Sequence, residues 1–118
     1  MATPNIVNVA TINVKNAAGA ITTSRAVAVD VADEKIAKIN TILIANIDGT
    51  NAADVTIEVS IDNGSNYVAI AKTISVPADA TLSFLENPIY LDETDLLAVT
   101  ASANSDLTYF VSYEEITD

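Results

Sequence analysis

The chain has 118 residues, of which half are apolar, so it is long and apolar enough for one domain with its own core. It has no cysteine, histidine or tryptophan, which excludes disulfides, thiolate metal sites and histidine-based catalysis. Five basic residues against sixteen acidic ones give a net charge of −11. Such a surface repels phosphate backbones, so we expect no direct binding to nucleic acid.

The acidic charge is unevenly distributed. All five basic residues lie within residues 1–72, whereas residues 73–118 carry nine acidic residues and no basic one. No segment approaches the roughly 20 apolar residues of a membrane span. The N-terminal Met-Ala-Thr-Pro has neither the basic start nor the hydrophobic run of a signal peptide. We therefore expect synthesis in the cytoplasm, no membrane partner and no export by the usual route.

The first third of the chain is predicted to form two strands. Residues 5–14 are rich in Ile, Val and Asn and form the first candidate, residues 16–19 read as a turn, and residues 21–31 form the second candidate. Because a short turn joins the two runs, we expect them to pair as a hairpin.

Residues 36–47 are more ambiguous. Residues 42–45 are apolar on both faces, which indicates either a central strand covered on both sides or a strand whose outer face meets another subunit. Ile36, Ile39, Leu43 and Ile47 also follow a 3.6-residue period, so a short helix is an alternative.

The clearest pattern lies in residues 54–76. Branched aliphatic residues alternate with polar ones from residue 54 to residue 62, which gives a strand with one apolar face. Asn63-Gly64 then separates this run from a second one, residues 67–76, and both turn residues tolerate a positive φ. The sequence predicts a hairpin, with a bulge near Ala71 that turns Lys72 outward.

Further strands are expected in the C-terminal part, at residues 80–85, 89–91, 97–102 and 107–115. Turn residues separate them at short intervals, giving seven to nine strands in all. This spacing is typical of an all-β fold, an antiparallel β-sandwich of jelly-roll type. We see no linker or repeat, so residues 1–118 are predicted to form a single β-sandwich domain.

Three groups of acidic residues deserve weighing as calcium sites, because Ca²⁺ prefers six to eight oxygen ligands. They are Glu86 with Asp92, Glu93 and Asp95; Asp48 with Asp54; and Asp62 with Asn63. None has the spacing of an EF-hand loop, and acidic residues commonly shape turns. We therefore predict no metal and no cofactor. Paired carboxylates alone, without a nucleophile–base pair or cofactor motif, do not indicate an enzyme.

Residues 42–45, which are apolar on both faces, and two of the tyrosines form the candidate contact surface. Of the four tyrosines, Tyr109 and Tyr113 lie in phase on the last predicted strand. A tyrosine there either packs half-buried with its hydroxyl in water or anchors an interface. We predict an interface formed by Ile42, Leu43, Ile44, Tyr109 and Tyr113.

Five stretches between residues 40 and 117 have a distinctive sequence: Ile44-Ala-Asn-Ile-Asp-Gly-Thr-Asn, Ser75-Val-Pro-Ala-Asp-Ala-Thr-Leu, Pro88-Ile-Tyr-Leu-Asp-Glu-Thr-Asp, Thr100-Ala-Ser-Ala-Asn-Ser-Asp-Leu and Ser112-Tyr-Glu-Glu-Ile. In these stretches the chain resembles small virion structural proteins of tailed phages. The resemblance implies a β-sandwich part of the capsid, neck or tail. It supplies no catalytic residues.

These observations lead to a functional prediction. We expect a phage virion structural protein, a capsid decoration or cement protein that binds the major capsid protein and forms a homo-oligomer, either a trimer or a ring. It would be made in the host cytoplasm and located in the virion. The alternatives are a neck or tail component and a sugar-binding or adhesion module.

Overall fold

The structure, a computed structural model, describes residues 11–117, and nine strands account for most of them. They are β1 (Thr11–Ile21), β2 (Ala26–Asp30), β3 (Ile36–Asn46), β4 (Ala53–Ser60), β5 (Val68–Val76), β6 (Thr81–Ser83), β7 (Ile89–Leu91), β8 (Leu96–Ala101) and β9 (Leu107–Thr117). The described part of the chain contains no helix.

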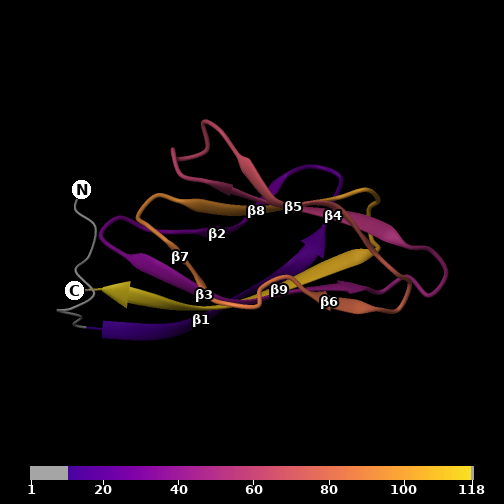
Figure 1. Cartoon of the computed structure of the whole chain (residues 1–118), viewed down its shortest axis with the longest axis horizontal. Helices are drawn as coiled ribbons and strands as arrows, with labels where there is room; N and C mark the ends of the chain where they lie inside the picture. Colours follow the sequence, from indigo (N-terminus) through magenta and orange to yellow (C-terminus); the bar gives the residue numbers. More distant parts are fainter. Residues whose placement is uncertain (1–10, 118) are drawn as a thin grey trace.

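The strands form two antiparallel sheets packed face to face (Figure 1). Sheet A has the order β1-β9-β3-β6, with β7 also pairing with β3, and sheet B has the order β2-β8-β4-β5. Because the chain crosses repeatedly between the sheets and β6 and β7 share one edge position, the arrangement is that of a jelly roll. The predicted all-β sandwich is confirmed.

The core lies between the sheets and is built almost entirely from branched aliphatic side chains. Strand alternation explains it, because the inward residues of adjacent strands come into register. On β3, Ile39, Ile42 and Ile44 are fully buried, and Val55 and Ile57 are fully buried on β4. The strand prediction for residues 36–47 is thus confirmed over its helical alternative.

The β4–β5 hairpin also follows its prediction. Asn63 has φ 56° and Gly64 has φ 90°, the positive values expected for this pair. The pairing register shifts on both sides of Ala71, and Lys72 is exposed. One of these bulges places Thr73 at φ 48°.

The expectation for the first third of the chain is wrong. The chain does not turn at residues 16–19, because β1 continues through them and pairs with β9 over its whole length. The next strand, β2, pairs with β8 in the other sheet, so the two make no hairpin. Residues 5–10 of the first predicted strand lie outside the described residues.

Gly19 lets this extended stretch pack beside an aromatic side chain of β9. It lies opposite Tyr109, and a Cβ at Gly19 would lie 3.4 Å from the tyrosine ring. A glycine in a strand provides room for an aromatic side chain on the neighbouring strand to lie across the backbone. The eleven-residue ladder with β9 therefore overrides the local turn preference of Asn16 to Gly19.

Candidate docking surfaces

The acidic groups form turns. Asp48 accepts hydrogen bonds from the backbone N–H groups of Thr50 (2.8 Å) and Asn51 (3.3 Å) and from the Asn51 side chain (3.3 Å). These donors, the Thr50 N–H first, lower the pKa of Asp48. Its carboxylate is therefore used to hold the turn that follows β3, as expected from ordinary turn chemistry.

Asp62 has the same role in the β4–β5 loop. Its carboxylate accepts hydrogen bonds from the side chain and the backbone N–H of Asn66, both 2.8 Å, and from the hydroxyl of Ser60, also 2.8 Å. The Asn66 side chain makes the largest contribution to lowering the pKa of Asp62. The loop is thus held by one carboxylate that accepts three hydrogen bonds.

In the turn before β8, Asp95 is 7% exposed, and its Oδ2 accepts a hydrogen bond of 2.9 Å from the N–H of Asp92. Glu93 accepts a hydrogen bond of 2.8 Å from the N–H of Glu34 on a different loop. Burial raises the pKa of Asp95. Within residues 11–117, no group of three or more acidic side chains is arranged to hold a metal ion.

The five residues predicted to form an interface divide into three sets. Ile42 and Ile44 are fully buried between the sheets, so their side chains belong to the core and cannot touch a partner. Leu43, between them, points to the outside of sheet A and is half-buried. Tyr109 and Tyr113 lie on the inward phase of β9 and are half-buried against the core.

The outside of sheet A has an unusual composition. Beyond the charged pair Lys38 and Glu114, which lies on the same outer face, the strand register brings together eleven outward residues of β1, β3, β6 and β9, which we call the neutral face. They are Asn16, Ala18, Ala20, Thr41, Leu43, Ala45, Thr81, Ser83, Thr108, Phe110 and Ser112. None is charged, although the chain carries 21 charged residues. Phe110, at its centre, is 40% exposed.

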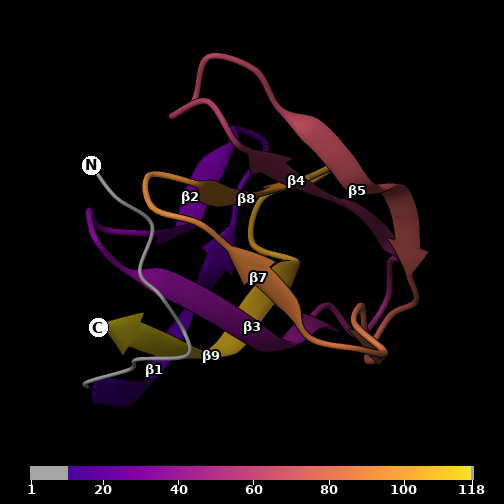
Figure 2. The same cartoon turned by 60° about the vertical axis from the view of Figure 1, so that its left-hand side comes forward.

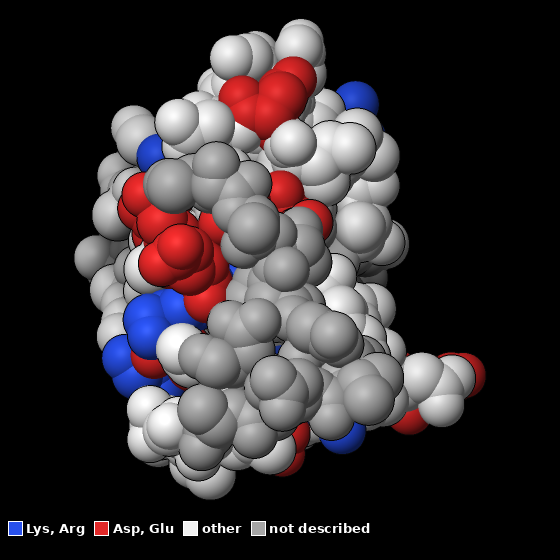
Figure 3. All heavy atoms as spheres, turned by 90° about the vertical axis from the view of Figure 1, so that its left-hand side faces the viewer, with Lys and Arg blue, Asp and Glu red and all other residues white. Residues whose placement is uncertain are grey.

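At the end where β1 begins and β9 ends, acidic and basic side chains lie side by side (Figure 3). There the Nζ of Lys15 lies 3.4 Å from Glu115 Oε1, and the Nζ of Lys35 lies 3.9 Å from the same oxygen. Since Lys15 is largely exposed, such pairs contribute little to stability. The described surface therefore contains separate charged and uncharged areas.

The sandwich is open along one side. β5 is the edge of sheet B and β7 lies at the facing edge of sheet A, and the two diverge (Figure 2). Between them lies a cavity of about 380 Å³, which we call the seam. Its lining is Val59, Ile61, Val68, Ile70, Ile89, Tyr90, Leu91 and Asp95.

Apolar side chains at the seam remain exposed to solvent. Val68 is 65% exposed, Ile70 47% and Tyr90 56%, and Ile61, just beyond the end of β4, is 78% exposed. Sheet interiors normally bury such residues, and a cluster of exposed ones indicates a docking site. The sequence alone does not reveal the seam, because alternation predicts an apolar strand face but not whether another strand covers that face.

Comparison with known proteins finds no matching family model and no matching curated protein. Solved structures do match. A pilus subunit of Bacillus endospore appendages matches with TM-score 0.55 and 16% identity, over 91% of this chain and 87% of that one. A chain of the icosahedral T13 IBDV viral particle matches with TM-score 0.53 and 7% identity, over 90% of this chain and 31% of that one.

A pentameric capsid protein from metagenomic phage sequences matches less well, with TM-score 0.41 and 13% identity, over 84% of this chain and 59% of that one. At these identities the likeness shows a shared fold. The first two matches come from an endospore pilus and an icosahedral viral particle. No helix among the described residues is long and apolar enough to span a membrane.

Proposed function

We propose that this protein is a structural subunit of a virion, a decoration protein that docks on the outside of a tailed-phage capsid and has no reaction of its own. The observation that carries the proposal is uncovered apolar surface on a sandwich that is otherwise strongly acidic. Leu43 and Phe110 on the neutral face, and Val68 and Ile70 at the seam, are the side chains concerned.

The energetic reason is the hydrophobic effect. Each 1,000 Å² of apolar surface removed from water contributes roughly 25 kcal/mol gross, most of which is offset by the cost of association. The neutral face suits this role because docking there desolvates no charge, and burying an unpaired charge is expensive. The chain's uncharged surface is thus where a partner can be bound without an electrostatic penalty.

The net charge of −11 has two consequences. Before assembly it keeps free copies apart and away from the nucleic acid that a capsid encloses. During assembly it favours a partner whose docking surface is basic or neutral, because like charges at an interface oppose binding. Both consequences fit a subunit that is produced in many copies and added to a finished shell.

A pilus-type or other filament subunit is the second candidate. It is favoured by the match to the endospore appendage subunit, which covers most of both chains. That protein forms disulfide-linked pili, whereas this chain has no cysteine and would need non-covalent contacts. A neck or tail component of a virion remains a related proposal. Copy number separates them, since a shell protein is present in hundreds of copies and a neck protein in a few.

The test is to purify the protein and the particles that contain it, remove the protein from the particles and heat both samples. We expect stripped particles to rupture at a lower temperature than intact ones, and added protein to restore the difference. A rupture temperature that is the same with and without the protein would contradict a cementing role. Long fibres of the protein alone, with no binding to particles, would favour the filament subunit.

A further inference from the structure

We propose that the seam receives an added β-strand, residues 5–9 of a second copy of this chain. The inference rests on the proposed function, because it names one of the contacts by which copies would assemble. Its first basis is the backbone. Within the described residues, β5 pairs only with β4 and β7 pairs only with β3, so each has an open edge beside the seam. Open edges readily accept an extended segment.

The second basis is the lining of the seam. Seven of its eight residues are apolar or aromatic, and Val68, Ile70 and Tyr90 are 47–65% exposed. The one carboxylate, Asp95, already accepts the Asp92 N–H. An occupant should therefore be extended, apolar on the side that enters the cavity and free of acidic side chains, because a buried carboxylate would find no basic partner there.

Residues 1–10 lie outside the described part of the chain, and their sequence meets these requirements. They contain no charged residue, and the first charge in the chain is Lys15. In Asn5-Ile6-Val7-Asn8-Val9 an extended segment presents Val7 and Val9 on one side, with Asn5 at the end of that side, and Ile6 and Asn8 on the other. Five extended residues span about 17 Å, the length of an average strand.

The geometry of sheet A indicates that the donor is a second copy. A strand added to the open edge of β7 would lie four strand spacings from β1, since β9, β3 and β7 intervene, which is about 19 Å. Only Ala10 separates Val9 from Thr11, the first residue of β1. Two Cα–Cα steps cover at most about 7.6 Å, so the same copy cannot place residues 5–9 in its own seam.

Disulfide trapping in the full-length chain tests the inference, and because the chain has no natural cysteine every cross-link joins engineered positions, so that mass spectrometry distinguishes the mixed dimer from dimers of one variant. One protein sample carries Val7→Cys, and the other carries either Val68→Cys or Ile70→Cys. The use of two positions on β5 samples neighbouring registers of the added strand. The control replaces Val27, which is 45% exposed on β2 at the other edge of sheet B. After mixing and mild oxidation, we expect about tenfold more cross-linked dimer from the seam pairs than from the control pair.

Two outcomes would overturn the inference. One is equal cross-linking of the seam and control pairs. The other is a chain carrying both Val7→Cys and Val68→Cys that closes within a single copy, which would make the occupant the chain's own segment. If copies still associate or bind particles without seam cross-links, the seam contact is wrong and the proposed function stands. If they neither associate nor bind particles, the proposed function fails as well.

A second measurement avoids cross-linking. Val7→Asp places a charge on the side that enters the seam, whereas Asn8→Asp places the same charge on the opposite side. In sedimentation equilibrium we expect Val7→Asp to weaken self-association about tenfold or more and Asn8→Asp to change it far less. Equal effects of the two substitutions would contradict the inference, because they would reflect net charge alone.

Discussion

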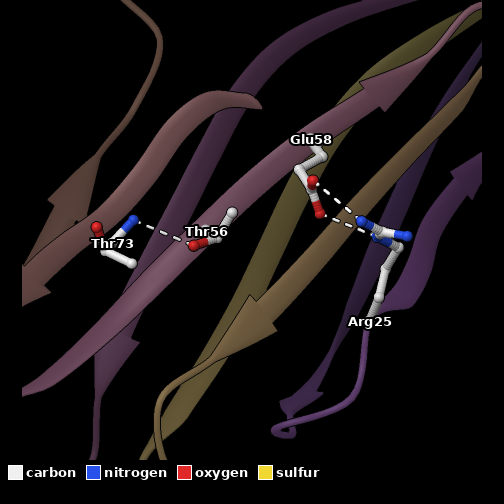
Figure 4. A network of polar contacts seen from close by, with 4 residues as sticks. All are labelled: Arg25, Thr56, Glu58 and Thr73. Carbon is white, nitrogen blue, oxygen red and sulfur yellow. Dashed lines mark hydrogen bonds and ion pairs between the residues drawn. The ribbon is translucent and has the colours of Figure 1, made fainter. Parts of the chain in front are cut away.

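The guanidinium of Arg25 reaches across β8 to Glu58 on β4, with Nε 2.9 Å from Oε1 and Nη2 3.1 Å from Oε2 (Figure 4). This parallel pair of hydrogen bonds is the geometry that arginine alone provides for a carboxylate. The same guanidinium lies 4.0 Å from the centroid of the Tyr67 ring. One side chain thus links the start of β2, the middle of β4 and the β4–β5 loop.

This relationship gives the first prediction. Arg25→Lys keeps the charge but loses the paired hydrogen bonds, so we expect it to lower the melting temperature nearly as much as Arg25→Ala does. In a Glu58→Gln background both substitutions should have a smaller effect, because the partner carboxylate is already absent. Thermal unfolding of all six combinations, with Arg, Lys or Ala at position 25 and Glu or Gln at position 58, measures this coupling. Fully additive effects would show that the contact contributes nothing to stability.

The β4–β5 loop provides a second prediction, through its glycine. Gly64 has φ 90°, and a Cβ there would lie 3.3 Å from a Leu96 methyl carbon, so Gly64→Ala is strained in two ways. We expect a loss of about 1 kcal/mol or more in the free energy of unfolding. Gly49→Ala is the matched control, because its Cβ would make only an ordinary contact of 3.5 Å with Asp79. Chemical denaturation should show the loss at Gly64 alone.

Asp95 supports a third prediction, on pH. Burial raises the pKa of its carboxyl in the folded chain above the unfolded value of about 3.9. Between these two values the folded chain keeps the proton and the unfolded chain releases it. The contribution of Asp95 to the free energy of unfolding therefore falls as pH rises through that window, and it stays lower at neutral pH. We expect Asp95→Asn to raise the melting temperature at pH 7 and to lose this advantage near pH 3.

Asp62 provides a control, because its pKa is shifted in the opposite direction to that of Asp95. Hydrogen bonds from Asn66 and Ser60 lower the pKa of its carboxyl in the folded chain. Its stabilising contribution is therefore present above the unfolded value and is lost as pH falls through the folded value. Asp62→Asn should lower the melting temperature at pH 7 and have little effect in strong acid. If both substitutions shifted melting in the same direction at pH 7, the assignment of buried and hydrogen-bonded carboxyls would be wrong.

The features of this structure that could be predicted from the sequence are those that interactions within one strand or turn decide. Alternation within residues 54–62 correctly predicted β4, because the period of side-chain direction is a property of a single strand. The turn expected at Asn16 to Gly19 was wrong, because the ladder with residues nearly a hundred positions away decides that backbone. Pairing partners of this kind leave no trace in local composition.

The candidate interface was limited in the same way. The sequence indicated that residues 42–45 are apolar on both faces, and the structure separates them into core residues such as Ile42 and the outward Leu43. The neutral face around Phe110 depends on four strands lying side by side, and the seam depends on β5 and β7 diverging. Neither surface exists within a single segment, so neither could be found before the topology was known.

The neutral face gives a fourth prediction, on binding. Leu43→Asp and Phe110→Asp place a charge at the centre of this face while leaving the core untouched, so we expect unchanged melting and binding to particles weakened about tenfold or more. Thr100→Asp is the control, because Thr100 lies on the outside of sheet B and adds the same charge elsewhere. Co-sedimentation with stripped particles measures binding. Equal loss for all three variants would exclude the neutral face as the docking surface.

The central claim is that this sandwich acts by docking in many copies on a regular particle. The most direct measurement is the number of copies in an intact purified virion, by quantitative mass spectrometry against the major capsid protein. We predict hundreds of copies in a fixed ratio to that protein, matching the symmetry of the shell. Absence of the protein from the particle, or a variable trace amount of it, would contradict the account.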